Sequence, residues 1–180
     1  MKYGFSLVVR CNDATPEGFT QIAERAEALE LDSLWCSAHI IVPPQVRSDY
    51  AMVPGRRYPD HWKERYWEPF TVLSYLAAKT ERLILGTSVT VLPMHSPFEV
   101  AKQSAEVDQL SGGRFILGLG PSGPQVAEGW HGVPYGKPVT RTREYIQIMK
   151  KIFEREGPVE FDGGMYQMPY KGPGATGLGK

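Results

Sequence analysis

Apolar residues form two kinds of segment along this chain, continuous short runs and longer stretches in which they recur at helical spacing. The continuous runs cover about residues 3–9, 33–37, 83–90 and 114–119. Runs of this length are typical of strands buried on both faces. Helical spacing appears between them, first at Phe19, Ile22, Ala23, Ala26 and Leu29. The pattern therefore predicts strands and amphipathic helices in regular alternation.

Capping residues mark where these helices begin and end. Thr-Pro at 15–16 and Ser-Pro at 96–97 place a hydroxyl at the N-cap and a proline in the first turn. The glycine pair 112–113 ends the second of these helices. Two more helices are predicted, one from Pro69 and one from about 141 to 154.

This order of elements predicts a fold of the α/β class. Strand, helix, strand, helix favours parallel strands joined by right-handed crossovers. After the last helix, the residues near 158–168 indicate a short β-hairpin with its turn at Asp162-Gly163-Gly164. With 180 residues, the chain is long enough for one domain with its own core.

Composition excludes several classes of partner. The 20 basic and 20 acidic residues cancel, so neither nucleic acid nor an anionic membrane is an expected partner. Because no run is long enough to span a bilayer and the start lacks a signal-peptide pattern, we expect a cytoplasmic location. Cys11 and Cys36 have neither metal-ligand nor disulfide-framework spacing, and the histidines lack ligand spacing, so no metal is expected.

The stretch RFILGLGPSG places Gly118, Gly120 and Gly123 at the spacing G-x-G-x-x-G directly after an apolar run. In a dinucleotide-binding domain this motif follows the first strand, whereas here it follows the fourth. Pro121 and Pro124 also remove two backbone N–H groups that would hold a pyrophosphate. The residues leave two interpretations open, a turn close to some ligand and ordinary turn chemistry.

A (β/α)₈ barrel explains the positions of the polar residues better, because its chemistry lies at the carboxyl ends of the strands. His39 directly follows the second strand, where it can transfer a proton or tie the next loop to the strand. The long segment 40–67 combines arginines with aromatic residues. We interpret it as an active-site loop that covers a flat ring; a surface excursion or a dimer contact is the alternative.

Three stretches resemble successive blocks of the bacterial luciferase-like superfamily of flavin- and deazaflavin-dependent oxidoreductases. They are AERAEALELDSLWCSAHI, EPFTVLSYLAAKTERLILGTSVTVLP and SPFEVAKQSAEVDQLSGGRFILGLG. The combination of LGTSV, LSGGR and GLG is specific to that superfamily. GPQVAEGWHGVPYGKPVTRTREYI and the ending GATGLGK are most similar to the branch that uses coenzyme F420, related to methylenetetrahydromethanopterin reductase.

The resemblance implies a (β/α)₈ TIM barrel, usually a homodimer, with the cofactor ring at the carboxyl ends of the strands. It implies hydride transfer between coenzyme F420 and a small organic substrate, with the chemistry supplied by the cofactor. An FMN-dependent monooxygenase of the same fold is one alternative, and a non-catalytic fragment or binding protein is another. Four strand–helix pairs fill roughly the first 155 residues, whereas a closed barrel needs eight. We therefore expect the N-terminal half of a barrel, with an incomplete cofactor pocket.

The resemblance also assigns residues. His39 matches the histidine near the reacting centre and is the predicted catalytic residue, and the Ser88–Val89 peptide, predicted to be cis, matches the pair behind the ring. Ala38 stands where the family commonly has an aspartate, so one expected polar contact is missing. The predicted cofactor-binding residues are Ala38, His39, Ser88, Val89, Leu119, Gly120 and Ser122.

Overall fold

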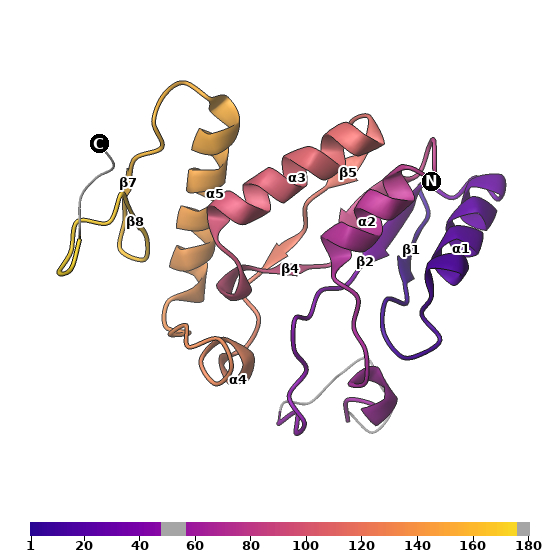
Figure 1. Cartoon of the computed structure of the whole chain (residues 1–180), viewed down its shortest axis with the longest axis horizontal. Helices are drawn as coiled ribbons and strands as arrows, with labels where there is room; N and C mark the ends of the chain where they lie inside the picture. Colours follow the sequence, from indigo (N-terminus) through magenta and orange to yellow (C-terminus); the bar gives the residue numbers. More distant parts are fainter. Residues whose placement is uncertain (48–56, 176–180) are drawn as a thin grey trace.

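The computed structural model describes residues 1–47 and 57–175. Four parallel strands form the central sheet, in the order β1-β2-β3-β5 (Figure 1). They are β1 (Gly4–Leu7), β2 (Ser33–Cys36), β3 (Ile84–Thr87) and β5 (Phe115–Ile116). Leu7, Cys36 and Thr87 are register partners, so the first three strands end at one edge of the sheet. The predicted parallel α/β class is confirmed.

The main helices lie between the strands in sequence. They are α1 (Pro16–Ala28), α2 (Pro69–Ala77), α3 (Pro97–Ser111) and α5 (Pro138–Glu154). Thr15 and Ser96 cap α1 and α3 as predicted, and Gly112 ends α3 with a left-handed φ of 67°. The last helix starts at Pro138, before the predicted position near 141, because proline suits the first turn of a helix.

The hydrophobic core lies between the sheet and the helices that cover one of its faces (Figure 1). Leu34 and Leu85 are register partners on neighbouring strands and are fully buried on the helix side. On the other face, Trp35 lies across Gly86, where an added Cβ would come within 2.4 Å of the indole ring. Of the apolar positions predicted on α1, Ile22 and Leu29 stay exposed, because no described segment packs against that side of the helix.

Two of the predicted strands are interrupted. The run 83–90 forms β3 and then β4 (Thr90–Val91), and the run 114–119 forms β5 and then β6 (Leu119–Gly120), with β4 and β6 paired in parallel. Between them the Thr87 hydroxyl accepts a hydrogen bond from the Gly118 N–H and donates one to the Gly118 carbonyl, both at 2.9 Å. The side chain thus replaces strand pairing beside the Ser88–Val89 bond, which is cis as predicted.

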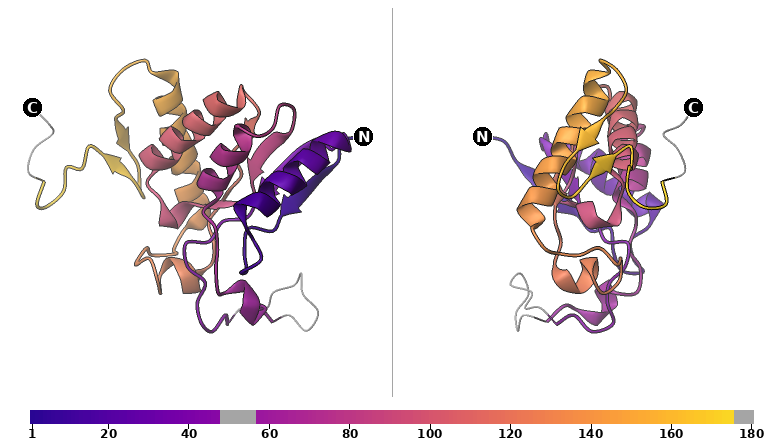
Figure 2. Two further views of the ribbon diagram at one scale, coloured as in Figure 1. Left: turned by 45° about the vertical axis from the view of Figure 1, so that its right-hand side comes forward. Right: turned by 90° about the vertical axis from the view of Figure 1, so that its left-hand side faces the viewer.

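The predicted hairpin is present as β7 (Phe161–Asp162) and β8 (Gln167–Met168), which pair antiparallel. It lies beside α5, at the opposite end of the molecule from α1 (Figure 2). The buried Glu144 of α5 holds the turn, because its carboxylate accepts hydrogen bonds from three successive backbone N–H groups at 164–166.

Three short helices complete the described chain: η1 (Asp60–Trp62), η2 (Leu92–Met94) and α4 (Pro124–Ala127). The helix after the glycine motif, α4, is four residues long. Within the part of the chain that the structure describes, no helix has the length and apolar character needed to cross a membrane.

Candidate functional site

The segments after β2, β3 and β6 gather at the carboxyl edge of the sheet. Residues 37–47 and 57–67 lie there together with α4, below the strands in Figure 1. The return segment is fixed to the continuation of β1, since the Cys11 N–H donates to the Arg65 carbonyl at 3.0 Å and the Trp67 N–H to Val9 at 2.8 Å. Parallel strands direct their connections to one edge in this way, so the predicted position of the site follows from the topology.

His39 lies in this region against two aromatic rings. Its imidazole meets Tyr66 edge to face with ring centroids 5.1 Å apart, and Tyr58 at 6.4 Å. Its Nδ1 atom is buried and has no hydrogen-bond partner among the described residues. Burial, and then the positive charge of Arg10, lower the pKa of His39 below its usual value of 6.5. The imidazole is therefore neutral at pH 7 and can accept or donate one proton.

The rings around His39 are themselves held in place. The Tyr66 hydroxyl is hydrogen-bonded to the Ser37 hydroxyl, and the Arg10 guanidinium lies 3.6 Å from the centre of the Trp62 ring. In the sequence, His39 was identified by its position directly after a strand. This criterion does not find its neighbours Tyr58 and Tyr66, because they reach His39 from a later part of the chain. Their only signal was the density of aromatic residues in the segment 40–67.

A cleft of about 370 Å³ opens beside His39. One wall is the segment 42–47, and the other comes from the turn and helix that follow β6. Ser122 belongs to this second wall and adopts a left-handed φ of 62°. The residues that line the cleft are His39, Val42, Pro43, Val46, Arg47, Tyr58, Ser122, Gly123, Pro124, Gln125 and Val126. A volume of this size is ordinary for a small-molecule site.

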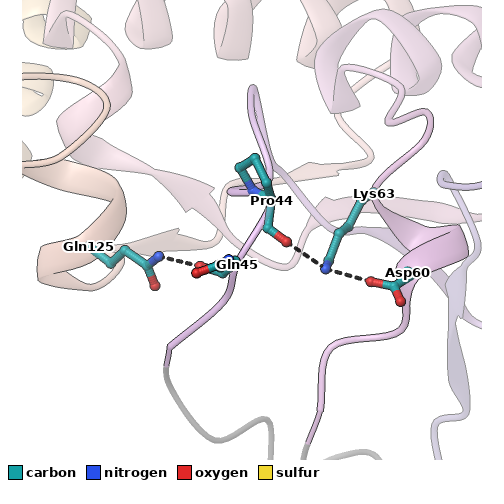
Figure 3. Close-up of polar contacts among 5 residues, drawn as sticks. All are labelled: Pro44, Gln45, Asp60, Lys63 and Gln125. Carbon is teal, nitrogen blue, oxygen red and sulfur yellow. Dashed lines mark hydrogen bonds and ion pairs between the residues drawn. The ribbon is translucent and has the colours of Figure 1, made fainter.

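Two side chains tie the wall 42–47 to its surroundings (Figure 3). The Gln125 amide donates to the Gln45 carbonyl and accepts from the Arg47 N–H at 3.0 Å. Lys63 donates to the Pro44 carbonyl at 2.9 Å and pairs with Asp60 at 2.6 Å. Neither anchor was predicted, because each joins residues far apart in the sequence to a backbone group that carries no sequence signal.

The predicted site residues fall into two groups. His39 and Ser122 line the same cleft, whereas the other five do not. Ala38 is buried and Leu119 is half-buried, while Ser88 and Val89 are exposed at the carboxyl edge. Gly120 is buried against Val89, since an added Cβ would stand 2.6 Å from the valine Cγ2 atom.

These contacts explain part of the glycine motif. A Cβ at Gly118 would stand 2.2 Å from the Thr87 carbonyl oxygen, and the one at Gly120 would meet Val89. Both glycines are therefore required by the close approach of β3, β4 and β6. The Ser88–Val89 surface is exposed and the Nδ1 atom of His39 lacks a partner among the described residues, so both remain available to a ligand. In residues 1–47 and 57–175, no group of three histidine, cysteine or acidic side chains is placed to hold a metal.

Comparison with known proteins identifies the family of the chain. The family described as luciferase-like monooxygenase matches residues 1–176. A candidate coenzyme F420-dependent oxidoreductase of Mycobacterium tuberculosis is 49% identical over 113 residues, which make up 63% of this chain and 33% of that protein. A 5,10-methylenetetrahydromethanopterin reductase of Archaeoglobus fulgidus is 34% identical over 109 residues, 60% of this chain and 31% of that protein. The matched residues thus cover about a third of each of these two relatives.

Solved structures show the same fold. The coenzyme F420-dependent tetrahydromethanopterin reductase of Methanopyrus kandleri superimposes with a TM-score of 0.67 and 22% identity, covering 92% of this chain and 44% of that one. The oxygenating constituent of 3,6-diketocamphane monooxygenase from Pseudomonas putida, in complex with FMN, superimposes with a TM-score of 0.71 and 20% identity. This match covers 96% of this chain and 44% of that one. The described chain therefore corresponds to part of a luciferase-like TIM barrel, and the predicted partial barrel is confirmed.

Proposed function

The chain belongs to the luciferase-like monooxygenase family, and we propose that it carries the proton-transferring group of a coenzyme F420-dependent oxidoreductase that acts on a small organic substrate. The observation that carries this proposal is the buried Nδ1 atom of His39, which has no partner among the described residues and lies at the wall of a cleft. A buried polar atom normally has a hydrogen-bond partner, so this one is expected to meet a ligand.

The surroundings of His39 suit a proton acceptor or donor. Burial keeps the imidazole neutral at pH 7, so Nδ1 can take a proton from a substrate hydroxyl or give one to a substrate oxygen. Tyr58 and Tyr66 pack against the ring and hold its orientation. The deazaflavin ring, when bound, supplies or takes up the hydride. Ser88 and Val89, exposed at the same edge, are the residues that we assign to hold that ring.

Coenzyme F420 is favoured over FMN by the relative at 49% identity, described as F420-dependent. An FMN-dependent monooxygenase is the second candidate, because a solved neighbour of the same fold holds FMN. Titrating the purified protein with each cofactor, followed by the absorbance and fluorescence of the cofactor, separates the two. Binding of F420 without FMN supports the first proposal, and binding of FMN alone contradicts it.

The role of His39 is tested by substitution. His39→Ala is expected to lower the turnover number roughly 10²–10⁴-fold, the usual contribution of a positioned acid or base, and to leave cofactor affinity nearly unchanged. The assay follows F420 reduction with a panel of small alcohols. Lys102→Ala serves as the control, because Lys102 is an exposed residue of α3 and lies outside the segments at the carboxyl edge of the sheet. Turnover by His39→Ala equal to that of the control would assign His39 a structural role only.

A further inference from the structure

Among the described residues, one side chain, that of Gln125, joins the two walls of the cleft beside His39 by hydrogen bonds. The apolar groups Val42, Pro43 and Val46 belong to the segment after β2, while the facing wall belongs to α4 and the turn before it. In sequence these walls lie about 80 residues apart. Within the described residues, two hydrogen bonds of the Gln125 side chain join them directly, and Figure 3 shows the one to the Gln45 carbonyl.

The side chain of Gln125 both donates and accepts a hydrogen bond, which few other side chains can do at this position. Its amide Nε2 donates to the Gln45 carbonyl, and its Oε1 accepts from the Arg47 N–H, so one side chain pairs with both polar groups of the segment. A carboxylate accepts but does not donate, and an apolar side chain does neither. Because Val46 lies between the two contacted residues, its position in the cleft is set by this pairing.

The cleft is lined mainly by uncharged groups. Among the described residues that line it, three are ionisable, namely His39, Arg47 and Tyr58. His39 is neutral, and Arg47 is exposed, so its charge is screened by solvent. The other described lining residues are uncharged: valines and prolines predominate, beside Gly123 and the polar Ser122 and Gln125. An ionised group among the valine and proline side chains would lose its hydration without full compensation.

We propose that Gln125 is a positioning residue for substrate specificity. By holding the segment 42–47 against α4, it keeps the cleft shaped for an uncharged, mainly apolar substrate with one hydrogen-bonding group for the Nδ1 atom of His39. This inference rests on the proposed function, since it assigns the substrate side of the same site.

Binding without any cofactor tests the inference independently of catalysis. The probes are 2-octanone and 7-oxooctanoate, which share a ketone and differ in the terminal carboxylate. Their dissociation constants for the purified protein are measured by saturation-transfer NMR. We expect the ketone to bind at least 10-fold more tightly than the keto acid. Equal affinities, or tighter binding of the keto acid, would overturn the inference.

Variants then assign the effect to Gln125. Gln125→Ala is expected to weaken the binding of 2-octanone about five- to tenfold, and Gln125→Glu, which keeps the acceptor and loses the donor, by a smaller factor. Gln147→Ala is the matched control, because Gln147 is an exposed glutamine of α5. Circular dichroism checks that each variant is folded. If Gln125→Ala is unfolded, the affinity of Gln125→Glu for 2-octanone decides whether Gln125 has the positioning role. Affinities equal to wild type in the folded variants refute the positioning role.

Turnover separates this inference from the proposed function. In an active enzyme, Gln125→Ala raises the KM for a long apolar substrate and leaves kcat nearly unchanged, whereas His39→Ala lowers kcat. If the protein binds neither F420 nor FMN, the proposed function fails, and the ketone titrations still decide the role of Gln125. An effect of Gln125→Ala on kcat alone would overturn the inference.

Discussion

Arg114, the arginine of the LSGGR motif, is predicted to be a main contributor to stability. Its guanidinium donates five hydrogen bonds, which link the end of α2, the start of β3 and the end of α3. The acceptors are the carbonyls of Ala77, Thr80, Leu83 and Ser111 and the Thr80 hydroxyl. Four separate backbone carbonyls therefore depend on one side chain. Replacing Arg114 with alanine leaves all of them without this partner.

The size of the effect follows from these contacts. A hydrogen bond to a charged group contributes about 1.5–3 kcal/mol, so five independent ones would contribute roughly 7–15 kcal/mol. The five hydrogen bonds share one guanidinium group, so their contributions are not additive. Arg114 is also half-buried, so in the alanine variant water can hydrogen-bond some of the carbonyls that lose their partner. We expect Arg114→Ala to lower the free energy of unfolding by about 3–5 kcal/mol. Arg114→Lys keeps the charge but loses the planar fork, and is expected to lose most of the same amount.

Urea unfolding followed by circular dichroism measures this loss. With a slope of about 2 kcal/mol per molar urea, the Arg114→Ala midpoint should fall by roughly 2 M. Lys102→Ala is the control, because Lys102 is an exposed cation on α3. A loss below about 1 kcal/mol, or a lysine variant as stable as wild type, would show that the hydrogen bonds of the guanidinium do not hold these three elements together.

Three further predictions concern single side chains. Glu144→Ala should free the hairpin, because three backbone N–H groups lose their acceptor; hydrogen exchange at 161–168 should accelerate, and unchanged protection would contradict this. Burial alone would raise the pKa of Glu27, but three backbone N–H donors hold it below 4.5. The stabilisation from Glu27 is thus complete above pH 4.5 and is lost as pH falls through the folded-state pKa. Glu27→Gln should flatten the pH dependence of the urea midpoints between about pH 5 and 3, and parallel profiles of the two proteins would refute this. Burial raises the pKa of the Cys36 thiol, whereas Cys11 is only partly buried. A thiol reagent at about pH 8 should therefore label Cys11 in the folded protein and reach Cys36 only after unfolding. Rapid labelling of both cysteines in the folded protein would contradict the buried position of Cys36.

Those elements that local chemistry determines were predictable from the sequence. Proline and hydroxyl residues marked the helix starts, and continuous apolar runs marked the parallel strands. The interruption of the last two strands was not predictable, because it depends on the Thr87 side chain pairing with Gly118 across 31 positions. The motif suggested cofactor contact for Gly120, whereas its contact with Val89 is visible only in three dimensions.

The same distinction holds in the candidate site. His39 was found from its place after a strand, which needs only the order of elements. Gln125 was missed because its partners are backbone groups of Gln45 and Arg47, and any residue type presents such groups. Long-range contacts between a side chain and the backbone have no sequence pattern of their own.

The long connection between β2 and α2 has both ends fixed to the rigid part of the fold. It leaves β2 at Cys36, and it returns at 65–67 against the continuation of β1, just before Glu68 caps α2. With fixed ends, doubling the length of such a loop costs only about 0.6 kcal/mol of closure entropy. A longer connection therefore costs little closure entropy, while a change within residues 42–47 alters a wall of the cleft. On the proposed function, this segment is the place where a change of sequence would alter substrate choice and leave the parallel sheet intact.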